Sequence, residues 1–184
     1  MKKQIYKLDL DDFGDDGEDL AYLFFHTTVP GYVFVDDLNH LYELSLRRLD
    51  DLPLEGDGWP LYTYRDSLQM VDYYLIERPA GPASTAPHWA PGHKMMILKG
   101  EQALNDAEHI IADFSTPLAH PNTGNPAEEE RYNILTSYQQ AFTPVTLYDI
   151  NAPAPTSKKV LRERSELEHL LTTIIDLLDL SGIE

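Results

Sequence analysis

Leu61 to Glu77 (LYTYRDSLQMVDYYLIE) decides the fold class of this chain. Two runs rich in aromatic and branched residues flank a polar turn at Asp66-Ser67, which is the pattern of an antiparallel hairpin. The second run has apolar residues on both faces, with Val71, Tyr73 and Leu75 on one and Tyr74 and Ile76 on the other. This pattern is typical of an interior strand in a sheet that is covered on two sides.

The region before the hairpin contains a predicted helix and two segments whose pattern fits either a helix or a strand. Lys3 to Leu10 predicts a first strand, and the acidic stretch from Asp9 to Asp19 predicts a loop. The apolar residues that follow, as far as Pro30-Gly31, fit a short helix, although their aromatic content also permits a strand. Apolar spacing predicts a helix over about 33–44, while Ser45 to Leu54 fits either a helix or a strand.

The region after the hairpin begins with a Pro/Ala/Gly-rich loop from Pro79 to Gly92. Lys94 to Lys99 then predicts a buried strand, and Glu101 to Phe114 predicts a helix whose end also fits a strand. A polar loop leads to a predicted helix over Ala127 to Phe142 and a strand over Thr143 to Ile150. Residues 1–150 are therefore expected to form one α+β domain, with a mainly antiparallel sheet of about five strands and three to four helices.

An amphipathic helix is predicted at the C-terminal end, over residues 157–184, after a Pro-rich spacer at 151–156. Its apolar stripe is a candidate partner interface and contains Leu167, Leu170, Leu171, Ile174 and Leu178. Basic residues at its start are unfavourable beside the positive end of the helix dipole, so an acidic surface would stabilise them. The stripe can pack on its own domain or on a second chain, and we expect a homodimer.

Composition and charge narrow the possible partners. The 184 residues include 31 Asp and Glu against 14 Lys and Arg, so the formal net charge is −17 and no nucleic acid or anionic membrane is expected as a partner. No apolar run is long enough to span a bilayer, and no signal peptide is evident. Because no signal peptide is evident, the chain is expected to be cytoplasmic, and the lack of cysteine excludes disulfides.

Sequence motifs indicate no cofactor, no metal and no catalytic residue. Neither glycine of the acidic loop gives a register that matches a twelve-residue calcium loop. His88 and His93 lack the spacing and the glutamate of a zinc protease helix, and glycine-rich nucleotide loops and serine-nucleophile elbows are absent from the sequence. The candidate pocket instead lies on the hairpin, beneath the loop from Pro79 to Gly92; its residues are Tyr62, Tyr64, Arg65, Tyr73, Tyr74 and Glu77.

Asp37 to Leu54 (DLNHLYELSLRRLDDLPL) and Leu61 to Glu77 resemble a small bacterial family of unknown function, named for an Ile-Pro-Glu-x-x-x-Val-Asp-Tyr motif. The resemblance lies in a Leu-Asn pair on a helix, an arginine before Asp-Leu, and an aromatic hairpin. It covers under half the chain, and the naming motif is absent from Ile97 to Phe114, where it was expected. The resemblance implies a small α+β protein without assigned chemistry.

Two functions therefore stay open from the sequence. The first is a cytoplasmic interaction or structural module that self-associates. The alternative is an enzyme or small-ligand-binding protein that uses the tyrosine-lined pocket of the hairpin. The position of the loop from Pro79 to Gly92 relative to a closed polar pocket would distinguish them.

Overall fold

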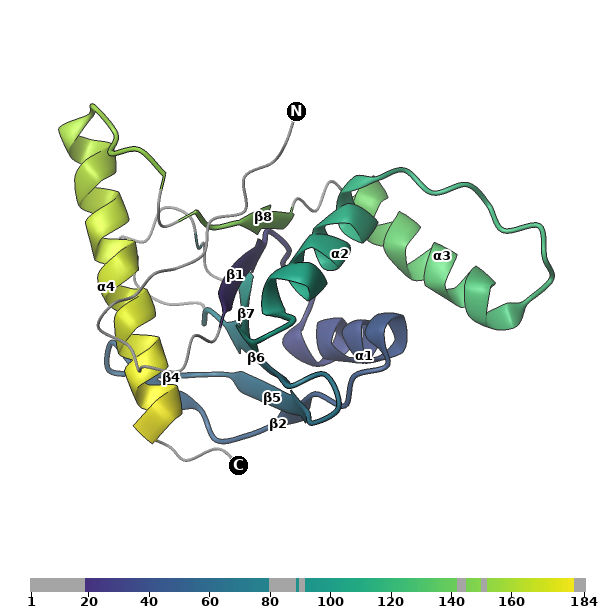
Figure 1. The fold of residues 1–184 in the computed structure, drawn as a ribbon, viewed down its shortest axis with the longest axis horizontal. Coiled ribbons are helices and arrows are strands. Elements are labelled where there is room, and N and C mark those ends of the chain that lie inside the picture. Colours follow the sequence, from purple (N-terminus) through teal and green to yellow (C-terminus); the bar gives the residue numbers. More distant parts are fainter. Residues whose placement is uncertain (1–18, 80–88, 90–91, 142–144, 150–151, 181–184) are drawn as a thin grey trace.

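The structure is a computed structural model that describes residues 19–79, 89, 92–141, 145–149 and 152–180 (Figure 1). Its helices are α1 (Gly31–Tyr42), α2 (Ala103–Ser115), α3 (Pro126–Gln140) and α4 (Lys158–Leu180). Its strands are β1 (Leu20–Phe25), β2 (Arg47–Arg48), β3 (Leu52–Leu54), β4 (Asp57–Trp59), β5 (Leu61–Asp66), β6 (Val71–Glu77), β7 (Lys94–Gly100) and β8 (Val145–Leu147). The predicted α+β class is confirmed.

The main sheet has six antiparallel strands in the order β2-β5-β6-β7-β1-β8, and β3 and β4 form a separate two-stranded sheet. The predicted hairpin is β5 and β6, in register with Tyr64 opposite Tyr73. As predicted, β6 is an interior strand, between β5 and β7, and its alternating side chains enter two different apolar clusters.

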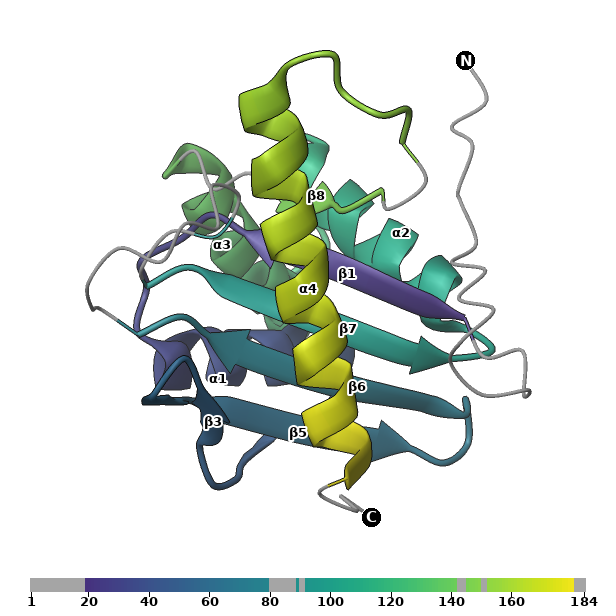
Figure 2. The same cartoon turned by 90° about the vertical axis from the view of Figure 1, so that its left-hand side faces the viewer.

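Helices cover both faces of the main sheet (Figures 1 and 2). On one face, which we call the helical face, α1 and α2 contribute Phe34, Leu38 and Ile110 to a cluster with Phe25 and Leu75. On the other face, which we call the α4 face, α4 crosses the strands (Figure 2). The core of that face also contains both tryptophans, Trp59 and Trp89, with ring centroids 5.0 Å apart.

The apolar stripe of α4 packs against the sheet of its own chain. The five residues of the candidate partner interface are at most 8% exposed, and they share one cluster with side chains of β1, β6 and β7. In contrast, residues 157–162 at the start of the helix are exposed. The described structure therefore places the stripe in cis, where it completes the second half of the core.

The structure also shows the secondary structure of the segments whose sequence fits either a helix or a strand. Leu20–Phe25 is a strand and not a short helix, because it lies between β7 and β8 and buries side chains on both faces. Ser45 to Leu54 contains β2 and β3, and the end of α2 remains helical to Ser115. Asn125 caps α3, with its side-chain oxygen 3.1 Å from the Ala127 nitrogen.

Some predictions fall on residues that the structure does not describe. The strand expected over Lys3 to Leu10 lies outside the described residues, as does most of the loop from Pro79 to Gly92. Among the described helices, none has both the length and the apolar character that crossing a membrane requires.

Candidate functional site

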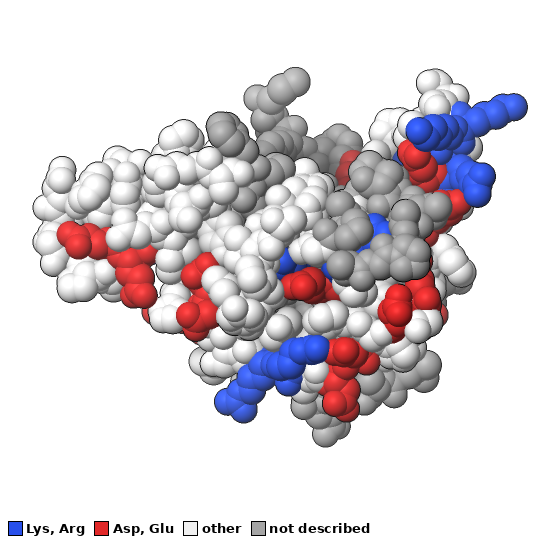
Figure 3. Space-filling model, turned by 180° about the vertical axis from the view of Figure 1, so that it is seen from behind, with Lys and Arg blue, Asp and Glu red and all other residues white. Residues whose placement is uncertain are grey.

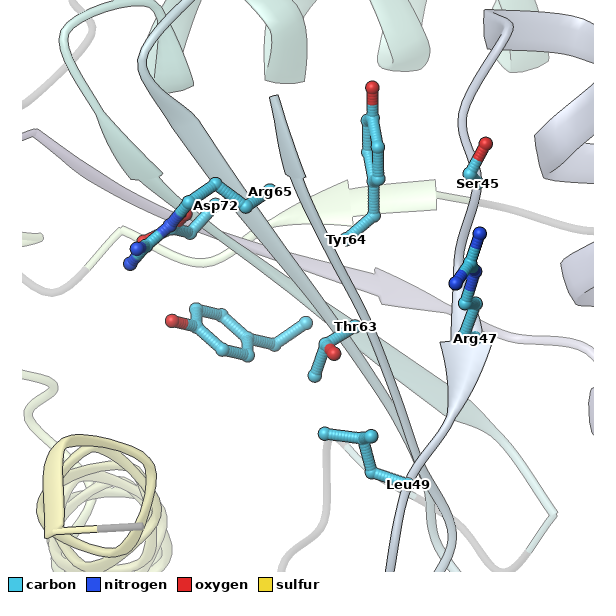
Figure 4. Close-up of a pocket in the computed structure, with 8 residues that line it drawn as sticks. Ser45, Arg47, Leu49, Thr63, Tyr64, Arg65 and Asp72 are labelled. Atoms are coloured by element: carbon cyan, nitrogen blue, oxygen red, sulfur yellow. The ribbon is translucent and has the colours of Figure 1, made fainter. Parts of the chain in front are cut away.

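An open groove with a volume of about 410 Å³ lies at the edge of the sheet where β2 meets β5 and β6 (Figure 4). Its lining consists of Ser45, Arg47, Leu49, Thr63, Tyr64, Arg65, Asp72 and Tyr74. The volume falls within the range of roughly 300–1,000 Å³ that is usual for small-molecule sites. Four of the eight side chains carry a hydroxyl, so the groove combines aromatic surface with hydrogen-bonding groups.

Strand geometry determines which side chains reach the groove. Thr63 and Arg65 alternate with Tyr62 and Tyr64 along β5, so the two pairs point to opposite faces of the sheet. In Figure 4, Tyr64 points toward the helices while Arg65 lies on the opposite side. Tyr64 still lines the groove because the partner strand β2 is only two residues long and starts opposite Thr63. The short edge strand thus leaves this part of β5 open.

A cross-strand ion pair fixes one wall of the groove. Arg65 on β5 lies opposite Asp72 on β6, and its Nε and Nη2 atoms are 2.7 Å and 3.1 Å from the two carboxylate oxygens. This two-pronged contact orients both side chains, and the pair as a whole carries no net charge. Arg47 on β2 faces the same groove and adds a second positive charge.

The sheet separates five of the six residues of the candidate pocket into two groups. Tyr62, Tyr64 and Tyr73 pack on the helical face, and Tyr64 and Tyr73 stack with ring centroids 6.0 Å apart. Arg65 and Tyr74 belong to the α4 face. Tyr64, Arg65 and Tyr74 line the groove, at the turn end of the hairpin. Position 79, where the predicted covering loop starts, follows the opposite end of β6.

Sequence reasoning missed five residues of the groove, which are Ser45, Arg47, Leu49, Thr63 and Asp72. The pairing of Arg65 with Asp72 follows from a hairpin register centred on the turn, so charge complementarity across that turn was an available signal. The position of Arg47 could not be predicted from the hairpin register. Its place in the groove depends on β2 pairing with β5, and Ser45 to Leu54 fits two structures equally well.

Glu77, the sixth predicted residue, pairs with a buried lysine at the other end of β6. The Lys94 side chain is 1% exposed, and its Nζ atom is 2.7 Å from the Gly92 carbonyl oxygen and 3.4 Å from Glu77 Oε2. Burial lowers the pKa of Lys94, while the charge of Glu77 opposes that shift. Glu77 Oε2 also lies against Gly31 at the start of α1, where a Cβ atom would overlap it. The pair therefore connects β6, β7 and α1 inside the core.

A second cavity, of about 280 Å³, lies between the hairpin turn and α1, α2 and α3. Two pairs of its polar groups bind each other: the Tyr73 hydroxyl donates to Asp106 at 2.6 Å, and Arg131 donates to Asp113 at 2.5 Å. Burial raises the pKa of Tyr73, and the hydrogen bond to Asp106 raises it further. The first contact joins α2 to the sheet, and the second joins α3 to α2.

Among the described residues, no group of three or more His, Asp or Glu could hold a metal ion. His93 lies beside His26, with ring centroids 5.5 Å apart, and burial lowers the pKa of His93. Comparison with protein-family models, curated proteins and solved structures finds no match to this chain. The groove therefore has to be interpreted from its own chemistry.

Proposed function

We propose that this chain is a cytoplasmic small-molecule-binding module whose ligand occupies the groove between β2, β5 and β6. The observation that carries the proposal is the convergence of two arginines and four hydroxyl groups on one concave surface beside tyrosine rings. Binding sites typically combine apolar and aromatic surface with a few polar groups that orient the ligand.

The strands that carry the groove side chains hold them in positions that favour ligand binding. Thr63, Arg65, Asp72 and Tyr74 project from two strands that are paired over six residues each, so the backbone holds them in a fixed arrangement. Ser45 and Leu49 flank β2. A ligand here would meet a largely preformed surface and would lose little affinity to ordering of the protein.

Filling the groove should abolish ligand binding. Thr63 lines the groove, and a Thr63→Trp substitution would place a large ring there on a strand that accepts aromatic residues. We expect compounds from a metabolite library to raise the Tm of the wild-type protein and to lose this effect in Thr63→Trp. A ligand at about ten times its Kd adds about 1.4 kcal/mol, which raises the Tm of a chain of this size by roughly 3–6 °C.

Thr146→Trp is the matched control, because Thr146 is exposed on β8, the opposite edge strand of the same sheet. The compounds that stabilise the wild-type protein should stabilise this variant equally. Equal stabilisation of all three proteins, or of none, would contradict the proposed site.

A second candidate function is self-association, through the first turns of α4. This part of the helix extends beyond the sheet (Figure 2), and Val160 and Leu161 are 42% and 47% exposed. Lys and Arg side chains gather at this projecting end (Figure 3), and the helix contains Lys158, Lys159 and Arg162 there. Two copies crossing in antiparallel orientation near Leu161 would place the lysines of one helix beside Glu163 and Glu166 of the other.

The double substitution Val160→Asp and Leu161→Asp should convert a dimer into a monomer of about 21 kDa, because it places charge at the centre of the proposed contact. Size-exclusion chromatography with light scattering measures this change. Leu68→Asp is the control, since Leu68 is 95% exposed on the hairpin turn and lies outside the proposed contact. A wild-type protein that is monomeric at tens of micromolar would exclude this candidate.

A further inference from the structure

We infer that the ligand of the groove is a small monocarboxylate with an aromatic or apolar body, and that Arg47 binds its carboxylate group. This inference rests on the proposed function and assigns the chemical class of the ligand. It follows from the charged side chains that line the groove and from which of them make ion pairs or hydrogen bonds with other residues.

The surroundings of Arg47 differ from those of the neighbouring arginine. Arg48 pairs with Asp51, and its guanidinium lies 5.3 Å from the centroid of the Tyr62 ring. Arg47 is exposed in the groove, and its side chain makes no hydrogen bond or ion pair with any residue that the structure describes. Within a chain of charge −17, a guanidinium available in a concave site is a natural partner for an anion.

The charge balance of the lining favours a single negative charge on the ligand. Asp72 holds Arg65 through two hydrogen bonds, so the net charge of Arg47, Arg65 and Asp72 is one positive unit. A carboxylate matches that charge and the planar geometry of a guanidinium. A phosphate dianion would keep an uncompensated charge close to Asp72.

The rest of the lining indicates the body of the ligand. Leu49 and the tyrosine rings offer apolar and aromatic surface, and the hydroxyls of Ser45 and Thr63 offer hydrogen bonds beside Arg47. An aromatic acid with a polar substituent can use all three kinds of contact. We therefore choose 4-hydroxybenzoate as the probe, with 4-hydroxybenzamide as its neutral analogue and inorganic phosphate as the dianion.

The test is a titration of the isotope-labelled full chain, followed through its backbone amide NMR signals. In the wild-type protein, 4-hydroxybenzoate should shift the amides of residues 47, 63 and 72 and should bind at least tenfold more tightly than the amide or phosphate. Arg47→Gln should weaken the binding of 4-hydroxybenzoate by roughly tenfold or more and leave the binding of the amide unchanged. Arg47→Lys should recover part of the loss.

Arg162→Gln is the matched control, because this arginine is exposed on α4 and pairs only locally with Glu166 among the described residues. It should bind 4-hydroxybenzoate as the wild-type protein does. Circular dichroism and Tm measurements on each variant establish that the fold is intact, which the exposure of Arg47 on an edge strand leads us to expect.

Two results would overturn the inference while the groove remains a ligand site. One is equal binding of 4-hydroxybenzoate and its amide at the groove, and the other is unchanged binding of 4-hydroxybenzoate in Arg47→Gln. In the second case, association of Arg47→Gln through its edge strand would show that Arg47 only protects β2 from pairing with other chains. Failure of the proposed function is a different result, in which neither probe shifts the groove amides and Thr63→Trp leaves the library response unchanged.

Discussion

Replacing Leu171 by aspartate should unfold the protein or leave it with only a small fraction of its stability. Leu171 is 2% exposed within the cluster that contains Trp59, Ile97 and the other stripe residues of α4. The substitution removes a large apolar side chain from the core and buries a carboxylate with no partner, so we expect a loss of about 4 kcal/mol or more in the free energy of unfolding. Urea denaturation followed by tryptophan fluorescence measures it.

The control for this prediction lies on the same helix. Val160→Asp changes an exposed residue and should alter the free energy of unfolding of the monomer by no more than about 0.5 kcal/mol. If Leu171→Asp instead gave a monomer with unchanged stability, the stripe would pack on a partner chain in solution and not on its own sheet. The experiment thus distinguishes the two positions that the sequence permits for α4.

Gly100→Ala should destabilise the protein by about 3 kcal/mol or more. Gly100 ends β7 with a φ angle of +137°, which side-chain-bearing residues rarely adopt. A Cβ atom there would overlap the Met70 carbonyl oxygen and lie 3.0 Å from the Met70 carbonyl carbon. Because these are backbone atoms of the turn before β6, the hairpin itself would have to move. Thermal and urea unfolding of the variant test this expectation.

Gly124→Ala provides the comparison for Gly100→Ala. Gly124 also has a positive φ angle, of +66°, but a Cβ atom there would have no described neighbour within 4 Å. The backbone conformation alone should cost about 1–2 kcal/mol at this position. Equal losses at the two glycines would mean that the close approach of β7 to the hairpin turn does not restrict the residue at position 100.

Elements with a strong local pattern could be predicted from the amino-acid sequence. The hairpin of β5 and β6 follows from two apolar runs of period two around a polar turn, and the apolar spacing of α1 and α4 predicts helices there. The two apolar faces of β6 also predict that the sheet is covered on both sides, as observed. Each of these inferences needs only neighbouring residues, and the predicted α+β class follows from them.

How those elements combine depends on contacts between segments that are far apart in the chain. The apolar stripe of α4 indicates that the helix packs against an apolar surface, but it does not identify that surface. The surface is the α4 face of the main sheet, whose strands are far apart in the sequence. The same holds for the groove, where Arg47 meets Thr63 because β2 pairs with β5. Leu20–Phe25 is a strand because β7 and β8 satisfy its backbone on both edges. Contacts between distant segments decide these features, and the pattern of any one segment does not contain them.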